Sequence, residues 1–158
     1  MPPLYRAVSH QRLDIAERLI LQHGASVDSE YGGKSTLLLA IELRYPQAVA
    51  LLLKHKAHVG YCCDFRGRGL LSVATAYDTT VAIVRQLLQQ TDIDVNDRCS
   101  AGMTAVMYAI EHRQYAILQL LLLDPRVELN VENNVGQTPL HFAISKEDYL
   151  SVQILVQN

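Results

Sequence analysis

Cysteines and histidines are the residues of this 158-residue chain whose chemistry could support metal binding. Cys62, Cys63 and Cys99 could supply thiolates to a zinc site, with His58 or His112 as a further ligand. A zinc site of this kind is normally built from two closely spaced ligand pairs, and the chain has no Cys-x-x-Cys pair facing a second pair. We therefore expect no metal or other cofactor and interpret the three cysteines as reduced thiols.

The same residue types could form a nucleophile with its base. Cys99 or Cys63, together with His112 and with Asp97 or Glu111, would supply the necessary side chains. No Gly-x-Ser-x-Gly, phosphate-binding glycine loop or His-Glu-x-x-His sequence accompanies them. Because the chain has six histidines, chance proximity to a cysteine is common, and catalysis is the less favoured interpretation.

Composition argues against other classes of function. The net charge of −2 and the absence of Lys/Arg clusters argue against binding to nucleic acid or to an anionic membrane surface. The longest apolar stretches, such as Leu120–Leu123, are far shorter than the roughly 20 residues that cross a bilayer. The odd number of cysteines and the lack of a signal-peptide core predict a soluble intracellular protein, in the cytoplasm or alternatively the nucleus.

The elements that must position these residues recur along the chain. Five alanines, at positions 7, 40, 74, 109 and 143, are separated by 33, 34, 35 and 34 residues. Four of them end related stretches, which are Gly-Lys-Ser-Thr-Leu-Leu-Leu-Ala (33–40), Gly-Arg-Gly-Leu-Leu-Ser-Val-Ala (67–74), Gly-Met-Thr-Ala-Val-Met-Tyr-Ala (102–109) and Gly-Gln-Thr-Pro-Leu-His-Phe-Ala (136–143). A fixed period of this length indicates one supersecondary unit stacked on its neighbours.

Each unit is predicted to be a helical hairpin. The first helix contains the alanine and begins after the glycine, where Thr138-Pro139 supplies a capping hydroxyl and a proline at the first helical position. A second helix follows about eight residues after each alanine, as in 15–20 or 117–122, with apolar residues at i, i+1, i+4 and i+5. Turn-forming sequences such as 24–28 and 94–97 predict a projecting turn or short β-hairpin between units.

These stretches resemble the ankyrin repeat family, whose consensus includes Gly-x-Thr-Pro-Leu-His-x-Ala-Ala, Ile-Val-x-x-Leu-Leu and Gly-Ala-x-Val-Asn. The resemblance is strongest at 136–143, and Gly24–Asp28 fits the turn signature. It implies an all-α solenoid forming one domain, 1–158, with repeats at approximately 1–28, 29–61, 62–96, 97–130 and 131–158. Copies two to four depart from the consensus, since Thr-Pro is replaced by Ser35-Thr36, Gly69-Leu70 and Thr104-Ala105, and the Gly-His between the helices is missing throughout.

The resemblance implies a protein-interaction scaffold, because this family typically recognises protein partners with a concave groove formed by its turn tips and first helices. Carried over by position, the partner-binding residues would be Tyr31, Lys34, Phe65, Arg66, Arg68, Arg98 and Met103 in the tips, and Glu42, Leu43, Tyr77, Glu111 and His112 in the first helices. Exposed aromatic and Arg side chains are the usual anchors of interfaces, so the site is centred on repeats two to four, beside Ala74.

Two alternatives are kept open. The solenoid could instead bind a small molecule or catalyse a reaction with the Cys, His and Tyr side chains of repeats two to four, which would need a compact cavity lined by Tyr77, Cys99 and His112. Phe65 or Tyr77 could also simply pack on a neighbouring turn, with the arginines solvated.

The C-terminal end of the stack is predicted to need a cover. Its last helix is rich in apolar residues, namely Tyr149, Leu150, Val152, Ile154, Leu155 and Val156. Terminal repeats normally present a polar outer face. We therefore expect further repeats, or self-association with another chain, at this face.

Overall fold

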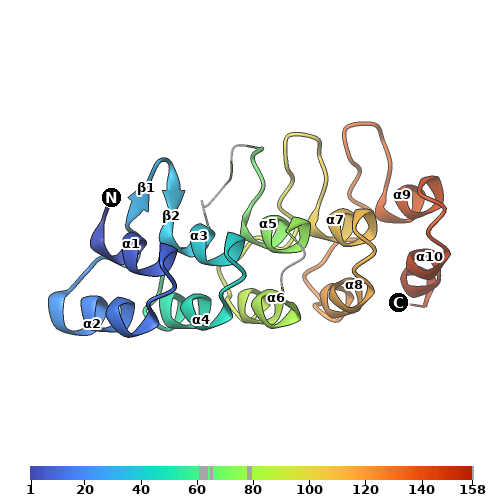
Figure 1. Ribbon diagram of the computed structural model, residues 1–158. Coiled ribbons are helices and arrows are strands. Elements are labelled where there is room, and N and C mark those ends of the chain that lie inside the picture. Colours follow the sequence, from blue (N-terminus) through green and yellow to red (C-terminus); the bar gives the residue numbers. More distant parts are fainter. Residues whose placement is uncertain (61–63, 65, 78–79, 158) are drawn as a thin grey trace.

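Two rows of short helices form an elongated stack in the computed structural model, which describes residues 1–60, 64, 66–77 and 80–157 (Figure 1). The first helices of the repeats form one row, α1 (Pro3–Ser9), α3 (Thr36–Glu42), α5 (Leu70–Ala76), α7 (Ala105–Glu111) and α9 (Pro139–Ser145). The second helices form the other row, α2 (Leu13–His23), α4 (Pro46–Lys54), α6 (Val81–Leu88), α8 (Tyr115–Leu122) and α10 (Tyr149–Val156). The prediction of a helical solenoid with projecting turns is confirmed.

The periodic alanines lie in the centre of the first-helix row. Ala40, Ala74, Ala109 and Ala143 are fully buried, and α3 contacts α5, α5 contacts α7, and α7 contacts α9. A small side chain at these positions allows adjacent helices to approach closely, because larger groups would separate the layers. The alanine period is therefore the repeat of a close-packed stack.

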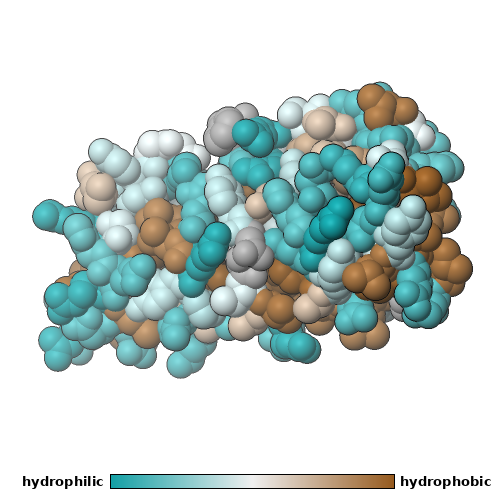
Figure 2. All heavy atoms as spheres, turned by 45° about the vertical axis from the view of Figure 1, so that its right-hand side comes forward, coloured by the Kyte–Doolittle hydropathy of each residue, from teal (hydrophilic) through white to brown (hydrophobic). Residues whose placement is uncertain are grey.

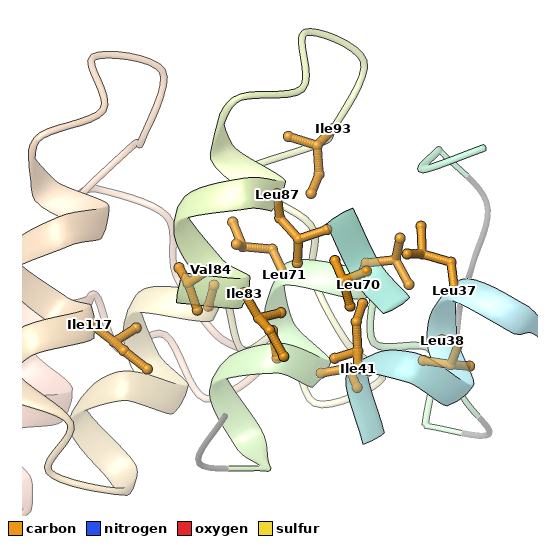
Figure 3. Packing of buried hydrophobic residues seen from close by; sticks show 14 of the residues in the cluster. Leu37, Leu38, Ile41, Leu70, Leu71, Ile83, Val84, Leu87, Ile93 and Ile117 are labelled. Atoms are coloured by element: carbon orange, nitrogen blue, oxygen red, sulfur yellow. The ribbon is translucent and has the colours of Figure 1, made fainter. Parts of the chain in front are cut away.

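The apolar residues of neighbouring repeats form one continuous core. Leu37, Leu38 and Ile41 of α3 and Leu70 and Leu71 of α5 lie beside side chains of the second-helix row (Figure 3). From that row, α6 contributes Ile83, Val84 and Leu87, and α8 contributes Ile117. Each repeat buries its apolar surface against the next repeat, as expected for a solenoid.

In repeats one, two, four and five, the loop between the two helices contains a residue other than glycine in the left-handed conformation. Gln11, Arg44, Arg113 and Glu147 have φ values of 54, 54, 53 and 54°. All four stand four residues after the alanine of their repeat, where the Gly-His of the family consensus is missing. An L residue in this conformation costs about 1 kcal/mol relative to the right-handed form, so the loss of glycine carries a stability penalty at each of these four loops.

Repeat two carries a β-hairpin at its tip. Strands β1 (Glu30–Tyr31) and β2 (Lys34–Ser35) are antiparallel, with Glu30 opposite Ser35 and Tyr31 opposite Lys34. Gly32 and Gly33 between them have φ of 61 and 75°. Two successive positive φ values are those of a type I′ turn, which matches the twist of the strands it connects.

None of the described helices has the length and apolar character that a membrane span requires.

Candidate functional site

The tips of repeats three, four and five share one hydrogen-bonding pattern. Asp64, Cys99 and Asn133 each stand three residues before the tip glycine. Their backbone N–H groups donate to the carbonyl oxygen four residues later, at 3.1, 3.1 and 2.9 Å. Their side chains accept from the N–H two residues later, at 2.9 Å for the Asp64 carboxylate, 3.3 Å for the Cys99 sulfur and 3.1 Å for the Asn133 amide oxygen. One side-chain acceptor therefore closes each of these three tips.

Neighbouring tips are also bonded to one another. The backbone N–H of Ser100 donates to the carbonyl oxygen of Arg66 at 3.0 Å, and the N–H of Asn134 donates to that of Ala101 at 3.1 Å. The Arg98 guanidinium donates to the carbonyl oxygen of Glu132 at 2.8 Å. The predicted binding residue Arg98 thus links the fourth tip to the fifth while its side chain stays exposed.

Arg68 is buried, which corrects the expectation of an exposed arginine at the third tip. Only 5% of its surface is exposed, and its Nε donates to Oδ2 of Asp64 at 2.8 Å, with a second bond from Nη2 to the same oxygen. Although burial opposes it, the hydrogen bonds from Arg68 and from two backbone N–H groups hold the pKa of Asp64 below its ordinary value. A buried charge is retained where a partner compensates it, and Asp64 is that partner.

Two tyrosines, one at the C-terminal end of α5 and one within α7, flank this guanidinium. The Arg68 carbon Cζ lies 5.1 Å from the ring centroid of Tyr77 and 5.6 Å from that of Tyr108. These distances allow cation–π attraction, which is stronger where water is excluded. Tyr77 is therefore held by a charged partner, whereas the sequence alone allowed it to pack on a neighbouring turn or bind a ligand.

Repeat four extends this aromatic group. The rings of Tyr108 and His112 are stacked, with centroids 6.5 Å apart and planes 7° apart. Burial, together with a hydrogen bond involving Cys99, raises the pKa of Tyr108. His112 is exposed and Cys99 is buried. The structure thus brings Tyr77 and His112 into one group. Tyr108 of repeat four also belongs to this group, and the sequence did not predict it.

Repeat two contributes an ion pair and an aromatic pair. The Lys34 ammonium donates to both carboxylate oxygens of Glu42, at 2.9 and 2.7 Å. The ring of Tyr31 lies 5.6 Å from that of Tyr5. Leu43, the remaining predicted binding residue of repeat two, is half-buried against the core.

The other predicted residues take varied positions. Glu111 is exposed and bonded to Lys146 of repeat five at 2.9 Å, and Met103 packs partly buried against the core. Arg66 is exposed. Phe65, and the cysteines 62 and 63 considered for metal binding, lie outside the described residues. Within the part of the chain that the structure describes, no three His, Cys, Asp or Glu side chains are grouped to hold a metal ion.

Asp97, considered above as an acid beside a catalytic histidine, caps a helix instead. Its Oδ2 accepts a hydrogen bond from the backbone N–H of Gly69 at 2.8 Å. Gly69 is the N-cap of α5 and has no side chain to cap it. A Cβ at Gly69 would lie 2.8 Å from the Asp97 Cγ, so only glycine allows this approach. Burial raises the pKa of Asp97 to about 6.

Comparison with known families agrees with the architecture. A family described as ankyrin repeats, in three copies, matches residues 70–158, and a single ankyrin repeat matches residues 1–30. No curated protein matches the chain. Residues 31–69 lie between the two matches, yet their helix α3 contacts both α1 and α5 and continues the stack. Ankyrin repeats are generally protein–protein interaction modules, and this chain belongs to the ankyrin repeat family.

Proposed function

We propose that the chain binds a partner polypeptide along the first-helix face of repeats two to four. This name denotes exposed and half-buried side chains of the tips, of α3 and α7, and of the residues that follow α3, α5 and α7, namely Tyr31, Lys34, Glu42, Leu43, Arg66, Tyr77, Arg98, Met103, Glu111 and His112. The observation that carries the proposal is the aromatic group around Arg68, in which Tyr77 and Tyr108 from two repeats flank one guanidinium and His112 stacks on the second ring.

This face suits protein recognition because its side chains are already held in place. Binding costs free energy for each side chain that must be immobilised, about 0.5–1.5 kcal/mol for a flexible one. Tyr77 is fixed by Arg68, and Lys34 is fixed by Glu42. Aromatic side chains that need no reordering are typical of the residues that dominate interface energies.

A matched pair of double variants tests the proposal. Arg66→Ala with His112→Ala removes two exposed side chains of the first-helix face, whereas Arg85→Ala with His23→Ala removes the same residue types from α6 and α2. Proteins captured by the immobilised wild-type chain are identified by mass spectrometry, and the dissociation constant of each is then measured with purified components. We expect the first variant to bind its partner at least about tenfold more weakly and the second to bind like wild type.

Two results would contradict this assignment. A partner that binds the Arg66/His112 variant as tightly as wild type would place the site elsewhere. A partner that is lost only with the Arg85/His23 variant would move it to the second-helix row. Thermal unfolding of all three proteins shows that the comparison is made between folded chains.

For cellular location we propose the cytoplasm, with the nucleus as the alternative. The support is the odd cysteine count and the free thiol of the buried Cys99. Microscopy of a fluorescent fusion in the native cell checks it, and a secreted fusion would contradict it.

A further inference from the structure

Repeat five exposes apolar side chains, two of them, Leu140 and Ile144, at positions that interior repeats bury. This C-terminal face consists of Leu140, Ile144, Tyr149, Leu150 and Val156, and brown side chains gather at that end of the stack in Figure 2. Ile144 is 57% exposed, whereas the equivalent Ile110 of repeat four is 1% exposed. Burying such surface is favourable by roughly 25 cal/mol per Å², and in repeat four the following repeat provides the cover.

The opposite end presents a matching hollow. This N-terminal face is lined by Met1, Pro3, Ala7, Ile15 and Leu19, together with basic side chains, around a volume of about 660 Å³. The residues of repeat four that correspond to Ile15 and Leu19 are Ile117 and Leu121, and both are buried within the stack. The two ends therefore expose the two sides of the same repeat-to-repeat interface.

Polar contacts between consecutive repeats fix how the two faces would meet. The Tyr45 hydroxyl donates to the carbonyl oxygen of Gln11 in the preceding repeat at 3.3 Å. The Tyr115 hydroxyl donates to Oδ1 of Asp148 in the following repeat at 3.1 Å. Tyr45 and Asp148 both stand five residues after the alanine of their repeat, which is the position of Arg12 in repeat one.

In the same register, Arg12 of an added repeat would meet two residues of repeat five. Glu147 occupies the position of Gln11, and Tyr149 occupies the position of Tyr115. Glu147 and Tyr149 are both exposed. The N-terminal face also carries Arg6 and His10. Within one copy, Nε and Nη2 of Arg12 donate to the Asp14 carboxylate at 3.3 and 3.2 Å, which leaves the Nη1 donors of the guanidinium for Glu147. Opposite charges therefore still meet at this contact.

We propose that a second copy of the chain docks its N-terminal face on this C-terminal face and continues the stack head to tail. Such contacts between unlike surfaces leave one free face at each end, so they build open chains of copies unless the rotation closes a ring. The contact lies apart from the first-helix face, which stays accessible in every copy. The proposal therefore stands independently of the proposed partner-binding site.

Light scattering during size exclusion tests this assembly. The mass of the wild-type chain is expected to rise with concentration above the 17.7 kDa of one copy. Ile15→Glu disables the N-terminal face and Ile144→Glu the C-terminal face, so each variant alone stays monomeric. An equimolar mixture retains one good face of each kind and is expected to form a 1:1 dimer and nothing larger.

Leu123→Glu is the matched control, because Leu123 is a 76% exposed apolar residue of repeat four outside both faces. It is expected to assemble like wild type. A charge test follows from the register: Arg12→Glu weakens assembly at least about tenfold, and adding Glu147→Arg to the same chain restores it.

Three outcomes would overturn the proposal. The first is a wild-type chain that remains monomeric at the highest soluble concentration. The second is self-association of Ile15→Glu alone, which would mean that two C-terminal faces pair with each other. The third is a monomeric mixture of the two face variants. Because both isoleucines are exposed, circular dichroism is expected to show folded variants in every arm.

Discussion

Repeats three and five close the same tip with different chemistry. In repeat five, the Asn133 amide oxygen accepts two backbone bonds, and Thr138 caps α9 from within the repeat through a capping box with His141. In repeat three, the Asp64 carboxylate accepts the equivalent backbone bonds and also holds the buried Arg68. Helix α5 then has no cap of its own and receives Asp97 from repeat four.

The two repeats obtain their stability from different sources. Repeat five follows the family consensus and satisfies its helix start with neighbouring residues of the chain. Repeat three has lost Thr-Pro and depends on a buried ion pair and on a side chain of the next repeat. In a solenoid, stability is the sum of the intrinsic stability of each repeat and of the interfaces between neighbouring repeats. Repeat three therefore depends less on its own contacts and more on its interface with repeat four.

Loss of the acceptor in the third tip is expected to destabilise the chain most. Asp64→Ala leaves the Arg68 guanidinium buried without its carboxylate, and removing one partner of a buried ion pair costs about 3–5 kcal/mol. Asn133→Ala removes the uncharged counterpart and is expected to cost about 1–2 kcal/mol. Urea denaturation followed by circular dichroism measures both free energies of unfolding.

Equal costs for the two alanine variants would show that the ion pair adds nothing beyond tip closure. Asp64→Asn serves as the intermediate case, since it keeps an oxygen for the backbone N–H groups and removes only the charge. Its free energy of unfolding is expected to lie between those of wild type and Asp64→Ala.

The second test uses the charge on Asp97. Its folded pKa of about 6 is above the ordinary 3.8, so the folded state binds the proton more tightly than the unfolded state. The free energy of unfolding therefore falls as pH rises from about 4 to about 6, by about 3 kcal/mol. Asp97→Asn keeps an oxygen for Gly69 without the charge and is expected to be more stable than wild type above pH 6.

The readout is the difference between the two unfolding free energies across pH 3.5 to 8, because carboxylates remote from residue 97 titrate equally in both proteins. Asp94→Asn removes a neighbouring negative charge that contributes to the raised pKa of Asp97, so it is expected to change the pH profile in the same direction by a smaller amount. A difference that is flat with pH would refute the linkage to Asp97.

The third test compares the same residue at the same place in two repeats. Thr138 is the N-cap of α9 and its Oγ1 accepts from the His141 N–H, whereas the buried Thr104 Oγ1 at the N-cap of α7 has no hydrogen-bond partner. Thr138→Val is expected to cost about 1 kcal/mol through the lost cap. Thr104→Val replaces an unsatisfied hydroxyl by a methyl group and is expected to be neutral or stabilising. Thermal unfolding that shows equal losses would contradict the local-cap interpretation.

The fold was predictable because its signals are periodic. The alanines, the apolar second helices and Thr138-Pro139 predicted hairpins and their starting points, and the structure has them there. The sequence predicted either a projecting turn or a short β-hairpin between repeats. Gly32-Gly33, which is typical of a type I′ turn and which the neighbouring repeats lack, connects the strands of the β-hairpin in repeat two.

The site was less predictable because pairing depends on the whole stack. Arg68 looks like an exposed tip residue until Asp64 is placed beside it, and Tyr108 looks like an ordinary core position until Arg68 points between two repeats. One signal was available: Asp64 occupies the place of Asn133 before the tip glycine. A carboxylate at this position can close the tip, and an arginine four residues later can pair with that carboxylate.

The smallest expected effect concerns the loops that both kinds of repeat share. Arg113 is exposed and has φ 53°, so Arg113→Gly removes the strain of a left-handed L residue. The added glycine also raises the entropy of the unfolded chain, which offsets part of this effect. The free energy of unfolding is expected to rise by about 0.5 kcal/mol overall. Arg85→Gly makes the same change on the exposed side of α6, where φ is helical, and is expected to cost about 1 kcal/mol. If the urea midpoint rises in Arg113→Gly and falls in Arg85→Gly, the effect comes from backbone conformation. If the midpoint falls in both variants, the Arg113 side chain makes a stabilising contact that outweighs the strain.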